Sequence, residues 1–156
     1  MKKIRIELQS DTCFASGELY NSSIDTDICY DEYGLPFIPA KRIKGCLRES
    51  ALELMDFELP DFQDLQVGVE DIFGKAGKQE AVFSLQNARL DRYAEYMEEL
   101  TACTRKEYKI QQAVLNNFTY IRQQTSIDET TGTAEETTLR SMRVMNKGLV
   151  FEREDL

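Results

Sequence analysis

The sequence predicts a single domain of the α+β class, and three patterns support this prediction. Near the N-terminus, Ile4, Ile6 and Leu8 alternate with polar residues, which is the period of a half-buried strand. From Pro39 onward, apolar residues recur at spacings of three and four, as in an amphipathic helix. Toward the C-terminus, threonine-rich arms flank the turn sequence TTGT, which is typical of a long β-hairpin. At 156 residues, the chain is long enough for one hydrophobic core.

A long loop separates the first strand from the helix. Residues 10–38 are rich in Asp, Ser, Thr and Tyr and hold at most a short strand around the sequence DICY. Loops of this length inside a compact domain are usually functional or mobile. Pro36 and Pro39 then restrict the backbone on either side of an apolar Phe-Ile pair. We therefore expect this pair to anchor in the core and to fix where the helix starts.

The helix that begins near Pro39 is expected to bury one apolar stripe. The spacing of the stripe matches one face of an α-helix. Proline suits a helix start, because the N–H that it lacks would have no intrahelical partner there. The stripe consists of Ile43, Cys46, Leu47, Ala51 and Leu54.

The middle of the chain predicts fewer regular elements. Residues 56–81 are acidic and contain three glycines, so we expect them to be irregular. The sequence AVFSLQNARL, residues 81–90, predicts a strand, and residues 91–118 predict a helix. One face of that helix is formed by Tyr93, Tyr96, Met97 and Leu100.

The C-terminal part predicts the hairpin, which we place at residues 119–151 of a single domain spanning 1–156. The chain stops soon after a strand-like stretch, with no turn or cap. We therefore expect an open sheet edge or a missing remainder of the fold, and self-association through such an edge.

The composition argues against several classes of protein. No apolar run approaches the roughly 18 residues of a membrane span, and the N-terminus lacks the apolar core of a signal peptide. Four widely spaced cysteines and no histidine argue against a zinc site and favour free thiols in a reducing cytoplasm. The lack of histidine also removes the commonest general acid and base of metal-free ribonucleases. We expect a cytoplasmic protein without a membrane partner.

The net charge of −9 is confined to the middle of the chain. Residues 49–100 hold 13 acidic and four basic side chains, whereas residues 1–48 and 101–156 are each balanced. The two ends are therefore free to meet an anion, while the middle faces solvent or a basic neighbour.

The sequence GLPFIPAKRIKGCLRES, residues 34–50, resembles the signature of the RAMP superfamily, the repeat-associated proteins of CRISPR effector complexes. In that signature, Leu-Pro-x-Ile-Pro leads into a helix carrying Lys-Gly-x-x-Arg. Three further features stand in the family's order: the Ile24-Asp25 pair upstream of this sequence, the IFG sequence with its turn and strand at 72–85, and the hairpin, which resembles the family's thumb.

Two features depart from the family pattern. IPAKRIKG stands where many relatives have a small Gly-Ser-Ser turn, and the C-terminal glycine-rich loop and final strands are missing. The chain therefore looks like the N-terminal domain of a larger, two-domain member of the family.

The resemblance implies a ferredoxin-like or RNA-recognition-type fold with a protruding thumb, incomplete at the C-terminus. It also implies a subunit that binds the guide RNA (crRNA) of a type III effector complex in antiviral defence. Target RNA and other effector subunits would be its further partners.

The cations after Pro39 agree with this function, because free N–H groups and basic side chains at a helix start cradle phosphate oxygens. The small hydroxyl side chains at the hairpin tip could insert between nucleotides. At the base of the hairpin, Arg143 is expected to hold phosphates together with Arg122 and Arg140. The alternative is a solvated helix start, paired with neighbouring carboxylates. The expected RNA-binding residues are Lys41, Arg42, Lys44, Gly45, Arg48, Arg122, Thr131, Gly132, Thr133 and Arg140.

Two other functions stay open. Target-cleaving family members carry a loop aspartate upstream of Leu-Pro-x-Ile-Pro, and Asp25 stands at the matching place, with Asp27 as the alternative. Asp25 would then hold Mg²⁺ for a metal-dependent endoribonuclease. The same aspartates could instead cap loops and turns. The third candidate is a protein-interaction module without an RNA role, which would dock through the acidic segment 49–100.

Overall fold

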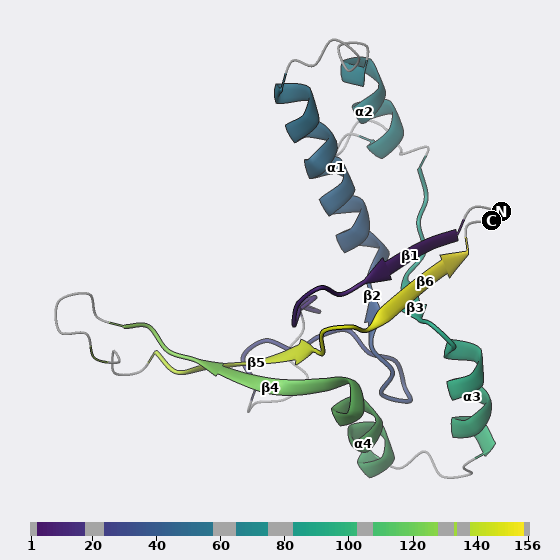
Figure 1. The fold of residues 1–156 in the computed structure, drawn as a ribbon, viewed down its shortest axis with the longest axis vertical. Coiled ribbons are helices and arrows are strands. Elements are labelled where there is room, and N and C mark those ends of the chain that lie inside the picture. The colour runs from purple at the N-terminus through teal and green to yellow at the C-terminus, as the bar shows by residue number, and fades with distance from the viewer. Residues whose placement is uncertain are drawn as a thin grey trace.

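The computed structural model describes residues 3–17, 24–57, 65–74, 83–102, 108–127, 133 and 138–154. These residues form a mixed structure of helices and antiparallel sheets, which confirms the predicted combination of α and β elements (Figure 1). In chain order, the elements are β1 (Lys3–Glu7), β2 (Phe37–Ile38), α1 (Ala40–Asp56), α2 (Leu65–Phe73), β3 (Ala88–Leu90), α3 (Tyr93–Ala102), α4 (Tyr108–Phe118), β4 (Thr119–Gln124), β5 (Arg140–Met145) and β6 (Val150–Glu154).

The central sheet has four antiparallel strands in the order β1-β6-β3-β2. Strand β6 pairs with the full length of β1, from Lys3 opposite Glu154 to Glu7 opposite Val150. On its other side, β6 pairs with β3. The C-terminal strand is therefore an inner strand, and the edges of this sheet are β1 and the two-residue β2.

A second sheet pairs β4 with β5 and projects sideways from the rest of the chain (Figure 1). Its register runs from Thr119 opposite Met145 to Gln124 opposite Arg140. The other edge of β5 is occupied by the N-terminal loop, because Thr12 bridges Met145 and Thr26 bridges Met142. The long loop is thus bound to the root of this β4–β5 ribbon.

The hydrophobic core lies between the central sheet, α4 and the root of the ribbon. Ile38 is fully buried there, which confirms one half of the expected Phe-Ile anchor. Phe37 is only half-buried and is not among the residues packed against this core. The predicted face of α3 also packs against this core. The buried core residues are Leu8, Ile28, Leu35, Ile38, Ala88, Leu90, Leu115, Met145 and Phe151.

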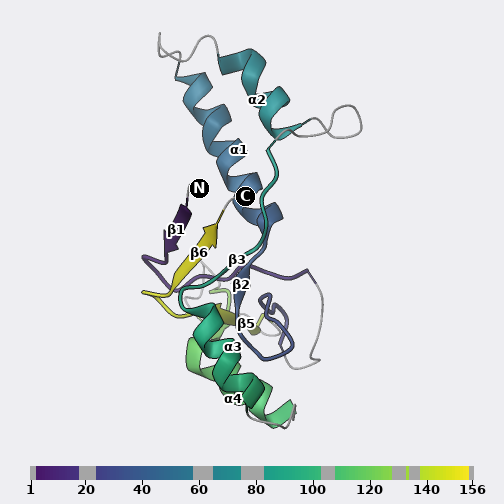
Figure 2. The same ribbon diagram turned by 90° about the vertical axis from the view of Figure 1, so that its right-hand side faces the viewer.

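Helix α1 begins at Ala40, as predicted, but the prediction that it buries an apolar stripe was wrong. None of its residues is buried, and Leu47 and Leu54 keep 42% and 43% of their surface exposed. The helix leaves the sheet after its first turn, where Ile43 touches the core, and then extends away beside α2 (Figures 1 and 2). The spacing of the apolar residues correctly predicted the helix. It could not show that few other parts of the chain pack against it.

The middle of the chain differs from the prediction in two further places. Helix α2 lies within the segment that we expected to be irregular, where Gly68 weakened the helical pattern. The strand expected over 81–90 is limited to Ala88–Leu90, and residues 83–87 run without strand pairing.

The single helix expected over 91–118 is two helices, α3 and α4. Residues 103–107, between them, lie outside the described residues. The rings of Tyr96 and Phe118 meet edge to face at 5.6 Å. One continuous helix would hold these residues about 33 Å apart, since each residue adds about 1.5 Å. Packing both apolar faces on one core therefore requires the break.

The loop before β2 is locked onto α4 at Gly34. Asp31 Oδ1 accepts the N–H groups of Tyr33 and Leu35, which folds the loop into a tight turn. Gly34 has φ +87°, and a Cβ there would overlap the backbone carbonyl of Gln111.

We predict that Gly34→Ala lowers the free energy of unfolding by roughly 2–4 kcal/mol, because the left-handed backbone and the overlap with α4 both add strain. Gly148→Ala is the matched control: Gly148 has φ +83° but nothing lies within 4 Å of its added Cβ, so only about 1 kcal/mol is expected. Urea unfolding measures both. Equal losses in the two variants would contradict the close contact with Gln111.

Candidate nucleic-acid interface

The first turn of α1 is fixed from two directions. Pro39 is extended, and its carbonyl accepts the N–H groups of Arg42 and Ile43. The N–H of Ala40 donates to Asn87 Oδ1 at 2.9 Å. Asn87, which precedes β3 and is 47 residues away in sequence, therefore holds the start of the helix in place.

The cations of α1 divide into two sets. Lys41, Lys44 and Arg48 have no ion-pair or hydrogen-bond partner among the described residues. Their spacing of three and four places them on one face of the helix. Arg42 lies off this face, and its Nη2 donates to the carbonyl of Ala15 at 3.3 Å. We call Lys41, Lys44 and Arg48 the α1 cations, and Arg42 fastens α1 to the N-terminal loop.

Gly45 lies between these cations and is exposed. No described atom lies within 4 Å of the position where a Cβ would stand. Among the residues that the structure describes, no close packing contact therefore requires a glycine at this position.

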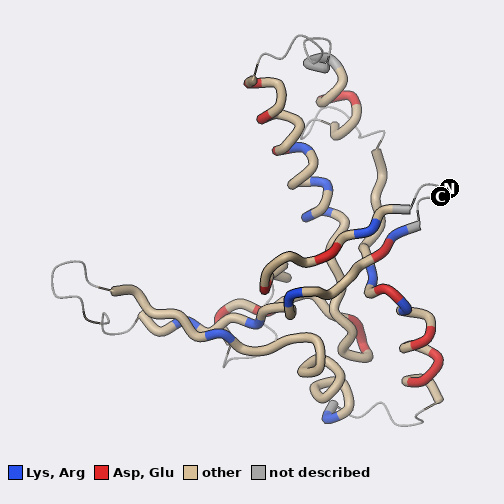
Figure 3. The backbone as a smooth tube through the Cα atoms, viewed as in Figure 1, with Lys and Arg blue, Asp and Glu red and all other residues tan. Residues whose placement is uncertain are grey.

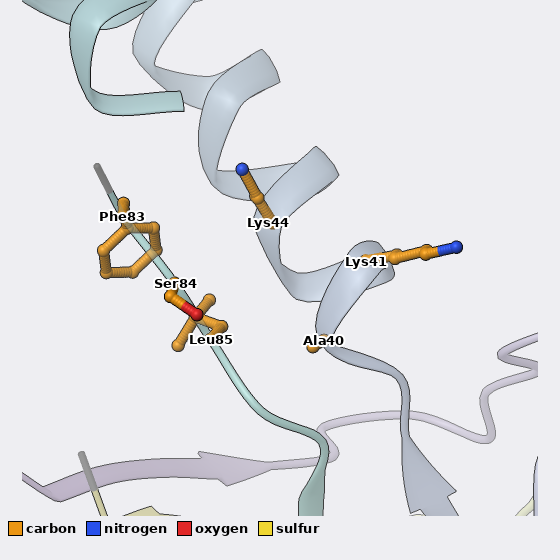
Figure 4. A pocket seen from close by; sticks show the side chains of 6 residues that line it. All are labelled: Ala40, Lys41, Lys44, Phe83, Ser84 and Leu85. Carbon is orange, nitrogen blue, oxygen red and sulfur yellow. The ribbon is translucent and has the colours of Figure 1, made fainter. Parts of the chain in front are cut away.

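A pocket of about 230 Å³ opens between the start of α1 and the segment before β3. Figure 4 shows Phe83, Ser84 and Leu85 across from the helix, with Lys44 leaning toward their side and Lys41 extending away. We call this the α1 pocket. The sequence did not indicate it, because the alternating residues before β3 predicted a paired strand.

The remaining expected RNA-binding residues lie on the ribbon. Arg122 and Arg140 are exposed and share one face of it, since Arg122 stands opposite Met142 and Arg140 opposite Gln124. Thr133 is exposed. Thr131 and Gly132 lie outside the described residues. Figure 3 shows the ribbon cations and the α1 cations on separate parts of the chain.

Arg143 does not join these exposed arginines, contrary to our expectation that it holds phosphate. Its side chain is 5% exposed. Nε lies 3.2 Å from Asp27 Oδ1, and Nη1 donates to Asn116 Oδ1 and Thr119 Oγ1 at 3.1 and 3.2 Å. This guanidinium is used inside the protein, where it joins the loop, α4 and the ribbon.

Three loop aspartates bind the ribbon root. Asp27 pairs with Arg143 and also accepts the N–H of Ile28. Asp25 Oδ2 accepts the N–H and hydroxyl of Ser141 at 2.7 and 3.1 Å. Asp11 accepts the N–H of Lys147 and the hydroxyl of Tyr120, at 2.9 and 2.8 Å. We call Asp11, Asp25 and Asp27 the aspartate clamp.

Both candidate catalytic aspartates, Asp25 and Asp27, belong to the aspartate clamp. Asp27 is buried and committed to an ion pair, whereas Asp25 is exposed. The bond from the Ser141 N–H lowers the pKa of Asp25, and Arg140 nearby acts in the same direction. Within the described part of the chain, no group of three or more His, Cys, Asp or Glu side chains is placed to hold a metal ion.

We predict that the clamp loosens in acid. The Lys147 N–H and the Tyr120 hydroxyl lower the pKa of Asp11, as Ser141 does for Asp25. A lowered folded-state pKa means that the stabilisation is complete above the unfolded value of about 3.9 and is lost as pH falls through the folded value. The amide NMR shifts of Ser141 and Lys147 should therefore move only below about pH 4. The double variant Asp11→Asn, Asp25→Asn should abolish that titration, and amides that stay constant down to pH 2 would contradict the clamp.

Comparisons with known proteins agree with this architecture. The chain is similar in fold to one described as "Cryo-EM structure of the Type III-B Cmr-beta bound to cognate target RNA", with a TM-score of 0.67 and 14% identity, over 96% of this chain and 81% of that chain. A chain of "Type III-B Cmr-beta Cryo-EM structure of the Apo state" matches with a TM-score of 0.65, the same identity and the same coverage.

No curated protein sequence matches the chain. No helix in the described ranges is both long and apolar enough to cross a bilayer. The family model of the RAMP superfamily matches residues 23–156, which include the second half of the loop, α1 and the ribbon. This chain therefore belongs to the RAMP superfamily.

Proposed function

We propose that this chain is a subunit of a type III CRISPR effector complex and binds the guide RNA along α1. The observation that carries the proposal is the row of α1 cations, which have no partner among the described residues. Membership of the RAMP superfamily and the fold shared with chains of type III-B Cmr complexes support it.

The α1 cations suit the backbone of a single strand. Lys41, Lys44 and Arg48 follow one helix face over about 10 Å. Such contacts set affinity and register without reading bases, as is needed when the guide itself reads the target by base pairing. The exposed Gly45 would let the strand approach the helix backbone closely.

The ribbon serves in this proposal as the family's thumb, on a ferredoxin-like core. Arg122 and Arg140 would hold phosphates on one of its faces. Ile121 and Leu139 are 49% and 65% exposed, and such apolar side chains can pack against unstacked bases of guide or target RNA.

Other subunits of the complex would contact the projecting arm formed by α1 and α2. Five large apolar side chains are exposed on this arm, although it carries several carboxylates. Leu47 and Leu54 lie two turns apart on one face of α1, and we propose that a protein partner covers this face. The five residues are Leu47, Leu52, Leu54, Phe57 and Ile72.

A second candidate function is cleavage of guide-paired target RNA through Asp25. Its exposed carboxylate and lowered pKa favour this role, because an ionised oxygen is a ligand that Mg²⁺ accepts. The described residues place no group of three or more His, Cys, Asp or Glu side chains around it and so do not fit a metal site of protein ligands alone. Mg²⁺ would have to share RNA phosphates, where it would polarise the scissile phosphodiester.

We predict that the triple variant Lys41→Gln, Lys44→Gln, Arg48→Gln weakens binding of a fluorescein-labelled single-stranded RNA and flattens its salt dependence. Each lost phosphate contact should reduce the slope of log K against log salt by about 0.7, or about 2 for all three. Fluorescence anisotropy between low and moderate salt measures this slope. Lys109→Gln, an exposed cation on α4, is the control and should leave the slope unchanged. Equal slopes for the native chain and the triple variant would refute the proposal.

For Asp25, the sharper variant is Asp25→Asn, because the amide oxygen can still accept the Ser141 N–H while the charge is lost. In the complex assembled with guide RNA, complementary target RNA and Mg²⁺, we expect Asp25→Asn to leave target binding and cleavage unchanged. Loss of cleavage with binding intact would instead assign the nuclease role to Asp25. Asp25→Ala, measured in parallel, removes both the charge and the hydrogen bonds to Ser141, so it shows the additional effect of losing this contact with the ribbon.

A further inference from the structure

We infer that the α1 pocket receives a single nucleotide of the bound RNA, with its base against Phe83 and its phosphate on Lys44. This inference rests on the proposed RNA binding along α1 and assigns the residues that would hold one base beside that path. The segment that forms the far wall, residues 83–85, belongs to none of the cation sets described above.

The two walls of the pocket are fixed relative to each other. At one end of the far wall, the N–H of Phe83 donates to the carbonyl of Ile72 in α2 at 3.0 Å. Just beyond the other end, Asn87 accepts the first N–H of α1. The wall is therefore tied to both helices of the arm, although it pairs with no strand, and the pocket exists before any ligand binds.

The lining combines the groups that a nucleotide needs. Phe83 and Leu85 are half-buried and offer an aromatic ring and an aliphatic surface. The Phe83 ring meets Phe73 edge to face at 5.8 Å, which limits its rotation. Lys44 supplies an ammonium group on the side of the opposite wall that faces the far wall, and Ser84 supplies a hydroxyl. Aromatic stacking beside a cationic track is how proteins hold single strands without reading sequence.

The size of the pocket limits the ligand. Its 230 Å³ is below the roughly 300–1,000 Å³ of sites that enclose drug-sized molecules. One base with its sugar fits this space better than a dinucleotide. The described lining residues include no Asn, Gln or carboxylate, and Lys44 is assigned to the phosphate. The Ser84 hydroxyl is then the described polar group left for a base edge, and because a hydroxyl can contact more than one kind of base, the pocket should not select strongly among bases.

The test uses the full chain and labelled 12-nucleotide RNAs that are either intact or abasic at every position. Phe83→Ala should weaken binding of intact RNA about 5- to 140-fold, the range expected for one lost stacking contact. The salt slope should not change, since no charge is lost. Abasic RNA should bind the native chain and Phe83→Ala equally, and Phe83→Tyr should bind intact RNA within about twofold of the native chain. Ile110→Ala removes an exposed apolar side chain on α4 and is the control, since Ile110 belongs to none of the proposed binding surfaces.

The two proposals fail in different ways. If the α1 cations matter for RNA binding but Phe83→Ala binds intact RNA like the native chain, the pocket assignment is wrong and RNA binding along α1 stands. If an oligoglutamate peptide loses affinity in Phe83→Ala while RNA does not, the pocket serves an acidic protein partner instead. Equal loss for abasic and intact RNA would mean that Phe83 acts only through the fold.

A measurement on the unmodified protein avoids the loss of the Phe83–Phe73 contact. Photo-cross-linking with 5-iodouridine RNA and mass spectrometry should give an adduct within residues 83–85. Adducts found only elsewhere would overturn the inference.

Discussion

The ribbon depends on the buried ion pair between Arg143 and Asp27. Two-stranded ribbons are marginal in water, so the direction of β4 and β5 must be set at their root. Arg143 sets it by contacting three separate elements, through Asp27, Asn116 and Thr119. A buried ion pair often adds little net stability over apolar residues of the same size. Its consequence here is geometric: a guanidinium with fixed donor directions accepts only one arrangement of loop, α4 and ribbon.

The same interaction explains how a loop that is rich in polar residues can hold a defined position against the ribbon. Asp25 and Asp11 act at the surface of the root, on either side of the buried pair. Between these two aspartates in sequence, the carbonyl of Ala15 accepts a hydrogen bond from Arg42, which ties the loop to α1. Both cationic surfaces, on α1 and on the ribbon, are thus positioned by the loop that lies between them in the fold.

The sequence predicted those elements that are determined by local rules. Alternation found β1, and Pro39 located the start of α1. The contacts that decide the rest are distant: Asp27 and Arg143 are separated by 116 residues, and Tyr96 meets Phe118 across a change of helix. A stripe of apolar residues shows that a helix has an apolar face, but it does not show which part of the protein covers that face. The expectation that α1 buries its stripe was wrong for this reason. For Asp25, the family resemblance suggested a role, and only the structure revealed its bonds to Ser141.

The charges of α1 oppose the stability of the helix itself. A helix start favours carboxylates and its end favours cations, each worth about 0.3–1 kcal/mol. In α1 the order is reversed: the first turn contains no acidic residue and the last turn no basic one. Lys41 and Lys44 are at the unfavourable end, as are Glu53 and Asp56 at the other. An anion bound along the first half of α1 would remove the unfavourable interaction at that end. The acidic tip would meanwhile repel the same anion and confine it to the base of the arm, which is where the pocket opens.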